Sequence, residues 1–300
     1  MRVFVTGATG FIGSAIVREL LETGHNVTGL ARSDQAAANL AAAGAEVHRG
    51  SLTDLDSLRA GAATADGVIH TAYIHDFSPT GDPAGAARTD GRAIEALGET
   101  LAGSGKPLVV ASGTALLAPG RPATEEDKMP DDTPHPRVSE QVVLQFAGRG
   151  VRVSAMRLPP SVHGQGDHGF VPALIGIARA KGLAAYVGDG SNRWAAVHRL
   201  DAARLFRLAL ESAPAGARLH AVGDEGVPFR DIAEVIGRHL SLPVTGISRA
   251  EADAHFGGFV LFASMDVPAS SVITQQRYGW RPAQPGLIAD LDAGHYFNEA

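Results

Sequence analysis

The sequence predicts an α/β fold built on a doubly wound parallel sheet, followed by a smaller C-terminal substrate-binding region. Over the first two-thirds of the 300 residues, short β-branched runs alternate with longer helical patterns. This alternation is typical of a parallel sheet that is covered by helices on both faces. A glycine-rich turn follows the first predicted strand directly, and the apolar fraction of 45% supplies enough residues for a large core.

Each predicted strand is a short apolar run, as expected for strands that are buried on both faces of a sheet. The strands are predicted at residues 3–6, 27–31, 45–49, 67–71, 107–112 and 152–157. Between the first two, the apolar side chains of Ile12, Ile16 and Leu20 recur at a spacing that places them on one face of a helix over 12–23. The strand–helix–strand order therefore begins with the first residues of the chain.

After residue 157 the regular alternation ends. Pro159, Pro160 and the glycines that follow indicate a loop, and helical patterns follow at 171–181 and from Asp201, which we expect to be a helix N-cap. A further strand is predicted at 218–222. We therefore expect a cofactor-binding domain at 1–160, to which 198–224 returns. The smaller substrate-binding domain is expected at 161–197 and 225–300.

Composition excludes several classes of protein. Charged residues make up 19% of the chain, the net charge is -6, and no basic cluster offers a surface for nucleic acid. The absence of cysteine excludes disulfides, thiolate metal sites and a cysteine nucleophile, and no metal-ligand spacing occurs among the histidines. We find no signal peptide or membrane-spanning run, so we expect a cytoplasmic protein with no bound metal.

The segment from Thr6 to Gly13 is the strongest motif in the chain. Three glycines at positions 7, 10 and 13 would make the tight turn, allow close approach of the backbone to a pyrophosphate, and let the helix pack on the sheet. The helix N-terminus then presents unpaired amides to the phosphates. We expect a Rossmann-type dinucleotide site whose contacts include Gly7, Thr9, Gly10, Phe11, Ile12 and Gly13.

The end of the second strand bears on which dinucleotide is bound. An NAD site places Asp or Glu here to hold the ribose hydroxyls, whereas this chain has Ala31, Arg32 and Ser33. A guanidinium beside a hydroxyl suits a 2′-phosphate, so we expect NADP(H) in preference to NAD(H). The alternative is that Arg32 is a solvated surface charge.

These motifs resemble the extended short-chain dehydrogenase/reductase family, which includes the NAD-dependent epimerases and dehydratases. Residues 6–13 are similar to its glycine motif, 70–72 to its segment after the fourth strand, and 109–115 to its fifth strand with the catalytic Ser or Thr. Residues 157–164 are similar to its Arg-x-x-Asn-Val-Tyr-Gly stretch, and 197–203 to its Val-His-Val-x-Asp-Val-Ala stretch. The resemblance implies further cofactor contacts at Ser51, Leu52, Thr71, Ala72, Ser112, Leu158, Pro159 and Pro160. It also implies a homodimer through the helices that flank the fourth and fifth strands.

The chain departs from this family at its proton-transfer pair, Tyr-x-x-x-Lys. None of the four tyrosines has a lysine four residues later. Alignment of the segment 134–140 on the usual helix start places Pro136 at the Tyr position and Glu140 at the Lys position. A carboxylate there would raise the pKa of a neighbouring phenol instead of lowering it. The chain therefore resembles the atypical branch of the family, which keeps the cofactor domain without this pair.

Other side chains near the predicted strand ends offer chemistry. The resemblance assigns Thr114 to orienting a carbonyl oxygen, while Tyr73 and His75 follow the fourth strand and are candidate proton donors. Asp76 and His135 are weaker candidates. The resemblance also implies substrate contacts at His163, in place of the family's Tyr, and at Arg193. Each of these residues has a structural alternative. Tyr73 would pack in the core, the Thr114 hydroxyl would bond to backbone at the end of its strand, and Arg193 would form an ion pair.

Three functional hypotheses follow. The first is an NADPH-dependent oxidoreductase that reduces a carbonyl of a small or medium organic substrate. The second is a non-catalytic NADP(H)-binding sensor, which the loss of Tyr and Lys favours. The third is an epimerase or dehydratase acting on a sugar nucleotide, which would place a basic cleft around Arg193.

Overall fold

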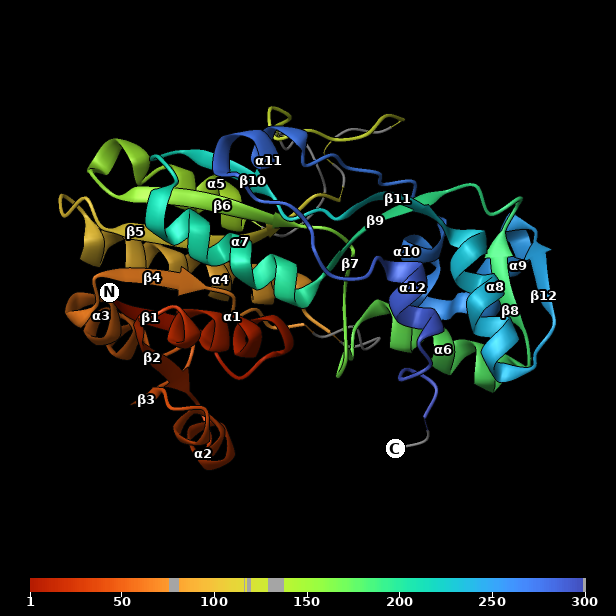
Figure 1. The fold of residues 1–300 in the computed structure, drawn as a ribbon, viewed down its shortest axis with the longest axis horizontal. Helices are drawn as coiled ribbons and strands as arrows, with labels where there is room; N and C mark the ends of the chain where they lie inside the picture. The colour runs from red at the N-terminus through yellow and green to blue at the C-terminus, as the bar shows by residue number, and fades with distance from the viewer. Residues whose placement is uncertain (76–80, 116, 118–119, 129–137, 299–300) are drawn as a thin grey trace.

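The computed structural model describes residues 1–75, 81–115, 117, 120–128 and 138–298, and a parallel sheet of seven strands forms its centre (Figure 1). The strand order is β10-β6-β5-β4-β1-β2-β3, and every neighbouring pair is parallel. The predicted α/β class is confirmed. The strands are β1 (Arg2–Thr6), β2 (Asn26–Ala31), β3 (Glu46–Arg49), β4 (Gly67–His70), β5 (Pro107–Gly113), β6 (Arg152–Leu158) and β10 (Ala217–His220).

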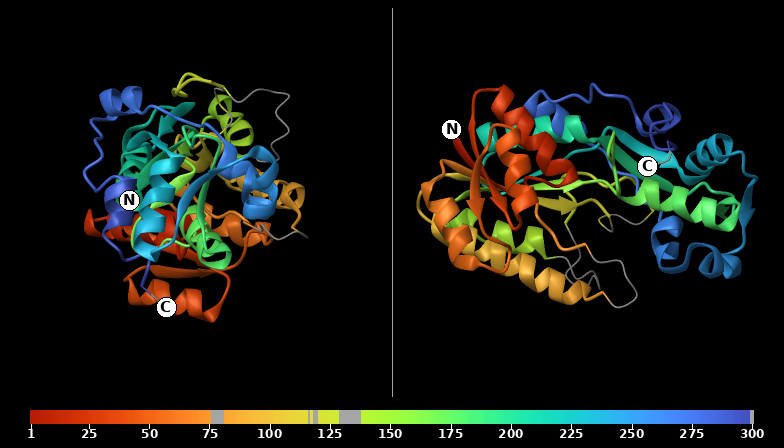
Figure 2. Two further views of the ribbon diagram at one scale, coloured as in Figure 1. Left: turned by 90° about the vertical axis from the view of Figure 1, so that its right-hand side faces the viewer. Right: turned by 90° about the horizontal axis from the view of Figure 1, so that it is seen from below.

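Helices cover both faces of this sheet, as Figure 2 shows in the view from below. One face carries α1 (Phe11–Glu22), α2 (Asp34–Ala42) and α7 (Arg199–Ser212), and the other carries α3 (Leu55–Thr64), α4 (Pro83–Leu101) and α5 (Ser139–Leu144). Alternate residues of β1 supply the two cores, because Val3 and Val5 pack on the α1 side while Phe4 packs on the α3 side. The doubly wound arrangement follows from this burial of both faces.

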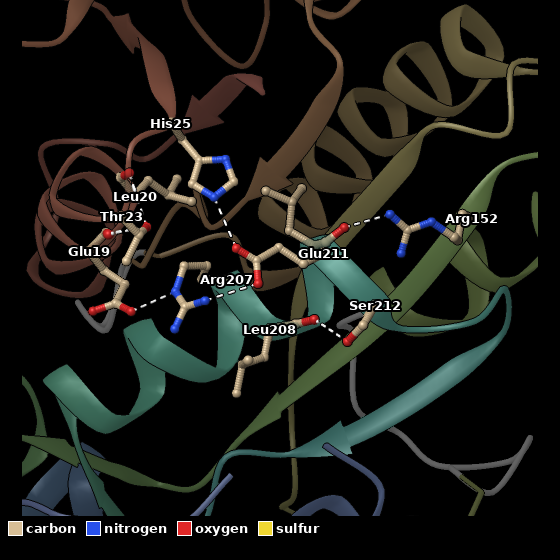
Figure 3. A network of polar contacts seen from close by, with 10 residues as sticks. Glu19, Leu20, Thr23, His25, Arg152, Arg207, Leu208, Glu211 and Ser212 are labelled. Carbon is tan, nitrogen blue, oxygen red and sulfur yellow. Dashed lines mark hydrogen bonds and ion pairs between the residues drawn. The ribbon is translucent and has the colours of Figure 1, made fainter. Parts of the chain in front are cut away.

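Helices α1 and α7 lie side by side, and a polar network fixes them together (Figure 3). Arg207 of α7 donates from Nε to Glu19 of α1 at 2.8 Å and from Nη1 to Glu211 at 2.9 Å. His25, in the turn after α1, lies 3.0 Å from the second carboxylate. The contacts to Glu19 and His25 therefore tie the second half of α1, and the turn after it, to α7.

A second group of elements lies beyond the carboxyl edge of the sheet (Figure 1). Its strands form a three-stranded sheet, β11-β9-β7, and a parallel pair, β12-β8. Trp194 and Phe229 are buried at the centre of its apolar cluster. The division of the chain into two domains stays a prediction. The elements of this second group are β7 (Ser161–His163), α6 (Phe170–Lys181), β8 (Ala184–Val187), β9 (Arg193–His198), β11 (Asp224–Pro228), α8 (Phe229–Leu240), β12 (Val244–Ile247), α9 (Arg249–Phe256), α10 (Val260–Ser264) and α12 (Leu287–Asp292).

The remaining short elements are α11 (Val272–Tyr278), beside β10, and two 3-10 turns, η1 (Ala147–Arg149) and η2 (Gly257–Phe259). Among the described helices, none combines the length and the apolar character that a bilayer crossing requires.

One predicted helix start is wrong. Helix α7 begins at Arg199, and its N-cap is His198, whose Nδ1 accepts a hydrogen bond from the Leu200 N–H at 3.2 Å. Asp201 lies in the first turn instead, where its carboxylate accepts from the backbone N–H groups of Ala283 and Gln284 at 2.9–3.0 Å. The N-cap preference of aspartate was outweighed by this contact with a distant segment.

Candidate cofactor and active site

The glycine turn joins β1 to α1 at the carboxyl edge of the sheet, and its geometry requires glycine at two positions. Gly7 has φ +70°, and a Cβ there would lie 2.7 Å from the Ala72 backbone nitrogen. A Cβ on Gly13 would lie 1.9 Å from the Gly7 carbonyl oxygen. Gly10 is the exposed N-cap of α1, so the first helical amides face outward from the turn. The turn fits a dinucleotide pyrophosphate because it brings exposed backbone close to the helix N-terminus.

The segment after β4 closes the other side of this turn. β4 pairs with one side of β1, and β2, the next strand in the sequence after β1, pairs with the other side. The order therefore reverses at β1, and ligands of doubly wound sheets bind at such a reversal. The Thr71 hydroxyl donates to the Thr6 carbonyl at 2.8 Å, which holds Thr71 and Ala72 against Gly7. Both residues are half-buried, so they remain available as predicted cofactor contacts.

The residues predicted to hold the adenosine end lie after β2 and β3. Arg32 is exposed and has no ion pair within the described part of the chain. Ser33 caps α2, since its hydroxyl accepts the Ala36 N–H at 3.2 Å. Ser51 and Leu52 are half-buried after β3, and the Ser51 hydroxyl lies 3.0 Å from that of Thr53. The Ser33 and Ser51 hydroxyls thus have local partners, whereas Arg32 is exposed, and cofactor contact by these residues stays a prediction.

Thr114 follows the carboxyl end of β5, and its main chain is held by β6. The Thr114 N–H donates to the Leu158 carbonyl at 2.9 Å, which joins two predicted site segments. The residue is 2% exposed, and its Oγ1 has no hydrogen-bond partner among the described residues. Ser112 is also buried, while Pro159 and Pro160 follow Leu158 directly. A buried hydroxyl without a partner is a costly feature that a ligand oxygen would satisfy.

The candidate proton donors after β4 lie close together. The rings of Tyr73 and His75 are 4.9 Å apart between centroids, at an interplanar angle of 50°. Tyr73 is half-buried and His75 is exposed. Both stay predictions as catalytic groups, and the weaker candidates Asp76 and His135 lie outside the described residues.

Glu140, at the family's Lys position, is one member of a buried ionic cluster. The Arg157 guanidinium is fully buried and donates to both Glu140 carboxylate oxygens at 2.7 Å, and Arg218 donates to one of them at 2.7 Å. These two cations hold the pKa of Glu140 below its ordinary value although burial opposes that shift. The position that would carry a ribose-binding Lys is thus occupied by a structural ion pair.

His220 completes this cluster, and its hydrogen bonds define its tautomer. Its Nδ1 faces the Ser270 carbonyl at 2.8 Å and must donate to it, so Nε2 accepts from the Arg157 guanidinium at 3.1 Å. Burial, with the Arg157 charge as the second cause, lowers the pKa of His220 to about 4. The folded protein therefore requires neutral His220.

Acidification is expected to destabilise the protein through His220. The folded pKa of about 4 lies below the ordinary histidine value of 6.5, so the stabilising contribution is present above pH 6.5 and is lost as the pH falls towards 4. The loss is on the order of 3 kcal/mol. Urea unfolding of wild type and His220→Gln between pH 7 and 4 measures it. The difference in unfolding free energy between the two proteins should shrink on acidification, and a constant difference would contradict the assignment.

A second buried network was not predicted from the sequence. His70, at the end of β4, lies with Nδ1 2.8 Å from the Thr6 hydroxyl and with Nε2 3.1 Å from Asp90 of α4. The Ser139 hydroxyl, at the start of α5, donates to the same carboxylate at 2.5 Å. All four side chains are buried, so they fix the end of β4, and with it Thr71 and Ala72, to the neighbouring strand β1 and to helices α4 and α5. No spacing of residues in the sequence predicted these contacts.

The predicted substrate residue His163 lies in the interior, with no exposed surface. Its Nδ1 lies 2.8 Å from Asp290 of α12, and its Nε2 has no hydrogen-bond partner in the described part of the protein. The loop after it is held by Tyr296, whose hydroxyl accepts the Gly164 N–H at 2.9 Å and donates to Asp167 at 3.2 Å. The C-terminal segment therefore fixes the loop after β7, and substrate contact by His163 stays a prediction.

The second predicted substrate residue, Arg193, is engaged by a carboxylate. Its Nε and Nη2 donate to the two Asp266 oxygens at 3.0 and 2.9 Å, and its backbone N–H donates to the same group at 2.8 Å. This is the ion pair that the sequence left open as an alternative. A substrate phosphate at Arg193 would have to compete with it.

The fold and the glycine turn define a Rossmann-type α/β protein, and comparison with known proteins names its family. The NAD dependent epimerase/dehydratase family model matches residues 3–222. The chain belongs to the NAD-dependent epimerase/dehydratase family, as the motif resemblance implied. This family includes oxidoreductases as well as epimerases, so membership does not select one reaction.

Three relatives and one solved structure illustrate the kinds of protein to which this chain is similar. An uncharacterized Schizosaccharomyces pombe protein is 52% identical over 99% of this chain and 100% of its own, and one from Saccharomyces cerevisiae is 47% identical with the same coverage. The 2-alkyl-3-oxoalkanoate reductase of Stenotrophomonas maltophilia is 30% identical over 81% of this chain and 77% of its own. The dTDP-glucose 4,6-dehydratase from Streptomyces venezuelae, solved with NAD and TYD bound, is similar at a TM-score of 0.76. Its identity is 21%, over 98% of this chain and 96% of that one.

Proposed function

We propose that the protein is an NADPH-dependent oxidoreductase that reduces a carbonyl group of a small or medium organic substrate. The observation that carries this proposal is the Thr114 hydroxyl, which is buried at the carboxyl edge of the sheet and has no partner among the described residues. A substrate carbonyl oxygen would accept its hydrogen bond and remove the cost of leaving it unpaired. The hydroxyl lies at the same sheet edge as the glycine turn, where a nicotinamide cofactor would bind.

The mechanism assigns distinct tasks to residues of this edge. Gly7, Gly10 and Gly13 admit the dinucleotide, and Arg32 binds its 2′-phosphate. When bound, the reduced nicotinamide supplies the hydride. Thr114 donates a hydrogen bond to the carbonyl oxygen, where negative charge develops during the reaction. Tyr73, with His75 beside it, supplies the proton that forms the alcohol.

The NADPH preference predicts a selective effect of Arg32. Arg32→Gln removes the charge-assisted hydrogen bonds to the 2′-phosphate and is expected to raise the Kd for NADPH roughly 10- to 100-fold, with the Kd for NADH unchanged. Fluorescence titration of the reduced cofactors measures both constants. Arg49→Gln is the matched control, because Arg49 is an exposed arginine already paired with Asp34 at 2.7 Å. Equal Kd values for the wild type and Arg32→Gln would refute the preference.

Two observations favour carbonyl reduction over chemistry on a sugar nucleotide. The Arg193 charge is compensated by Asp266, which weakens the case for a diphosphate-binding cleft there. The resemblance to a protein named as an oxoalkanoate reductase points in the same direction. The NAD in the dehydratase structure belongs to that protein, and a recycled NAD would also need an acidic residue at the end of β2, where this chain has Ala31, Arg32 and Ser33.

The second candidate function is a sensor that binds NADP(H) without turnover. It is favoured by the buried Glu140–Arg157 pair at the position that carries the catalytic Lys in the family. An assay of NADPH consumption with a panel of ketones, aldehydes and 3-oxoacyl esters separates the two. Turnover above the protein-free control supports the reductase, whereas tight NADPH binding without turnover on any substrate supports the sensor.

A further inference from the structure

We propose that Arg199 is an additional cofactor-positioning residue, which binds the diphosphate of the dinucleotide from the α7 side. This inference rests on the proposed cofactor site and assigns it a residue that the glycine motif does not contain. The Arg199 guanidinium carbon lies over the Phe11 ring at 4.9 Å from its centroid. Phe11 is the first residue of α1, and Arg199 is the first residue of α7. The cation therefore lies beside the turn that would hold the phosphates.

The register of the two helices brings their N-termini together. Phe11 and Arg199 form the first contact between the two helices. Eight residues further along each helix, Glu19 and Arg207 form an ion pair at 2.8 Å (Figure 3). At a rise of about 1.5 Å per residue, two contacts roughly 12 Å apart define a parallel, in-register pair. Both N-termini lie at the carboxyl edge of the sheet (Figure 1). Two partial positive helix ends thus face the same region.

The charge around Arg199 is uncompensated in the part of the chain that the structure describes. No hydrogen bond or ion pair joins Arg199 to another described side chain, whereas Arg207 on the same helix binds two carboxylates. Burial, and secondarily the charge of Arg18, lowers the pKa of Arg199, and no acidic group opposes this shift. A half-buried guanidinium beside two helix N-termini is unfavourable by itself and is relieved by an anion.

The surroundings of Arg199 hold the aliphatic part of its side chain and determine which phosphate of the cofactor its guanidinium would reach. The loop after β7 packs against it, since a Cβ on Gly164 would lie 3.3 Å from the Arg199 Cγ. His168 of that loop lies edge-on to Phe11, with ring centroids 5.9 Å apart. The guanidinium is thus held on the Phe11 ring, next to the helix amides that bind a diphosphate, whereas the expected 2′-phosphate residue, Arg32, follows a different strand.

Cofactor binding by Arg199 variants tests this inference. Arg199→Gln is expected to raise the Kd values for NADPH and NADH equally, by roughly 10- to 100-fold, because both contain the diphosphate. Arg199→Lys keeps the charge and should recover part of the affinity. The Tm of the cofactor-free Arg199→Gln protein should equal or exceed that of wild type, because an uncompensated cation has been removed. Arg18→Gln removes an exposed arginine of α1 that pairs with Glu22, and its Kd values should stay within about twofold of wild type as the matched charge control.

Each other outcome overturns a different claim. Unchanged Kd values in Arg199→Gln, with wild type binding both cofactors, would overturn the role of Arg199 alone. An increase for NADPH only would place Arg199 at the 2′-phosphate and overturn the diphosphate assignment. A lower Tm without cofactor would show that Arg199 is a structural residue. Failure of wild type to bind either cofactor would overturn the proposed function and this inference together.

Discussion

The Thr114→Val variant is expected to reduce carbonyl substrates roughly 10²- to 10³-fold more slowly than wild type, with an unchanged Kd for NADPH. Valine has the shape of threonine without its donor, so the developing oxyanion loses a preorganised hydrogen bond. Since Oγ1 has no partner within the described residues, the substitution removes an unsatisfied buried group. The unfolding free energy should therefore be equal to or above that of wild type. Steady-state kcat, cofactor titration and urea unfolding measure the three quantities.

Ser154→Ala is the matched control for Thr114→Val. Ser154 lies in the middle of β6, and its hydroxyl is likewise buried without a partner in the described structure. Its removal should leave both kcat and the Kd for NADPH unchanged, because it does not lie at the sheet edge. A kcat within threefold of wild type for Thr114→Val would contradict the role of Thr114 in catalysis.

The Arg157→Met variant is expected to lower the free energy of unfolding by about 3–5 kcal/mol at pH 7, because it breaks a buried ion pair by removing one partner. Glu140 would keep Arg218 and lose both Arg157 bonds. The carbonyl groups of Asp127 and Thr124, which accept from Arg157 at 2.7 and 3.4 Å, would lose their donor as well. Urea unfolding measures the change.

The exposed pair of Arg2 and Asp66 provides the control for this second prediction. Their side chains are largely exposed and 3.4 Å apart, so Arg2→Met should cost less than about 1 kcal/mol. The double variant Glu140→Gln/Arg157→Met should recover part of the loss, because it removes the buried carboxylate charge that would keep Arg218 alone as its partner. A loss below about 1 kcal/mol in Arg157→Met would contradict the structural role assigned to the cluster.

The sequence was sufficient to predict the architecture of the sheet and the glycine turn. Strands such as β1 and β6 were predicted to within about one residue of their observed bounds, because apolar β-branched runs between polar turns have few other solutions. The spacing of the glycines also predicted that positions 7 and 13 cannot accommodate a Cβ atom, as the structure shows. These features depend on local residues alone.

Contacts between distant segments were not readable in the same way. Asp290 reaches His163 across 127 residues, and nothing in either local sequence indicates the other. Glu140 was recognised as a departure from the family pattern, but its partners Arg157 and Arg218 follow from sheet pairing. Arg199 did carry a signal, because it stands where the family pattern has an apolar residue, yet its place over Phe11 depends on the packing of α1 and α7.

Transfer of deuterium from NADPH to the product tests the central claim most directly. The protein would be incubated with NADPH that is labelled with deuterium at C4 on either face, together with a ketone that the turnover assay identifies. Carbonyl reduction by hydride transfer predicts an alcohol one mass unit heavier from one of the two labelled cofactors, and an unlabelled alcohol from the other. Unlabelled product from both cofactors, or NADPH binding without any alcohol, would contradict the assignment of the protein as a carbonyl reductase.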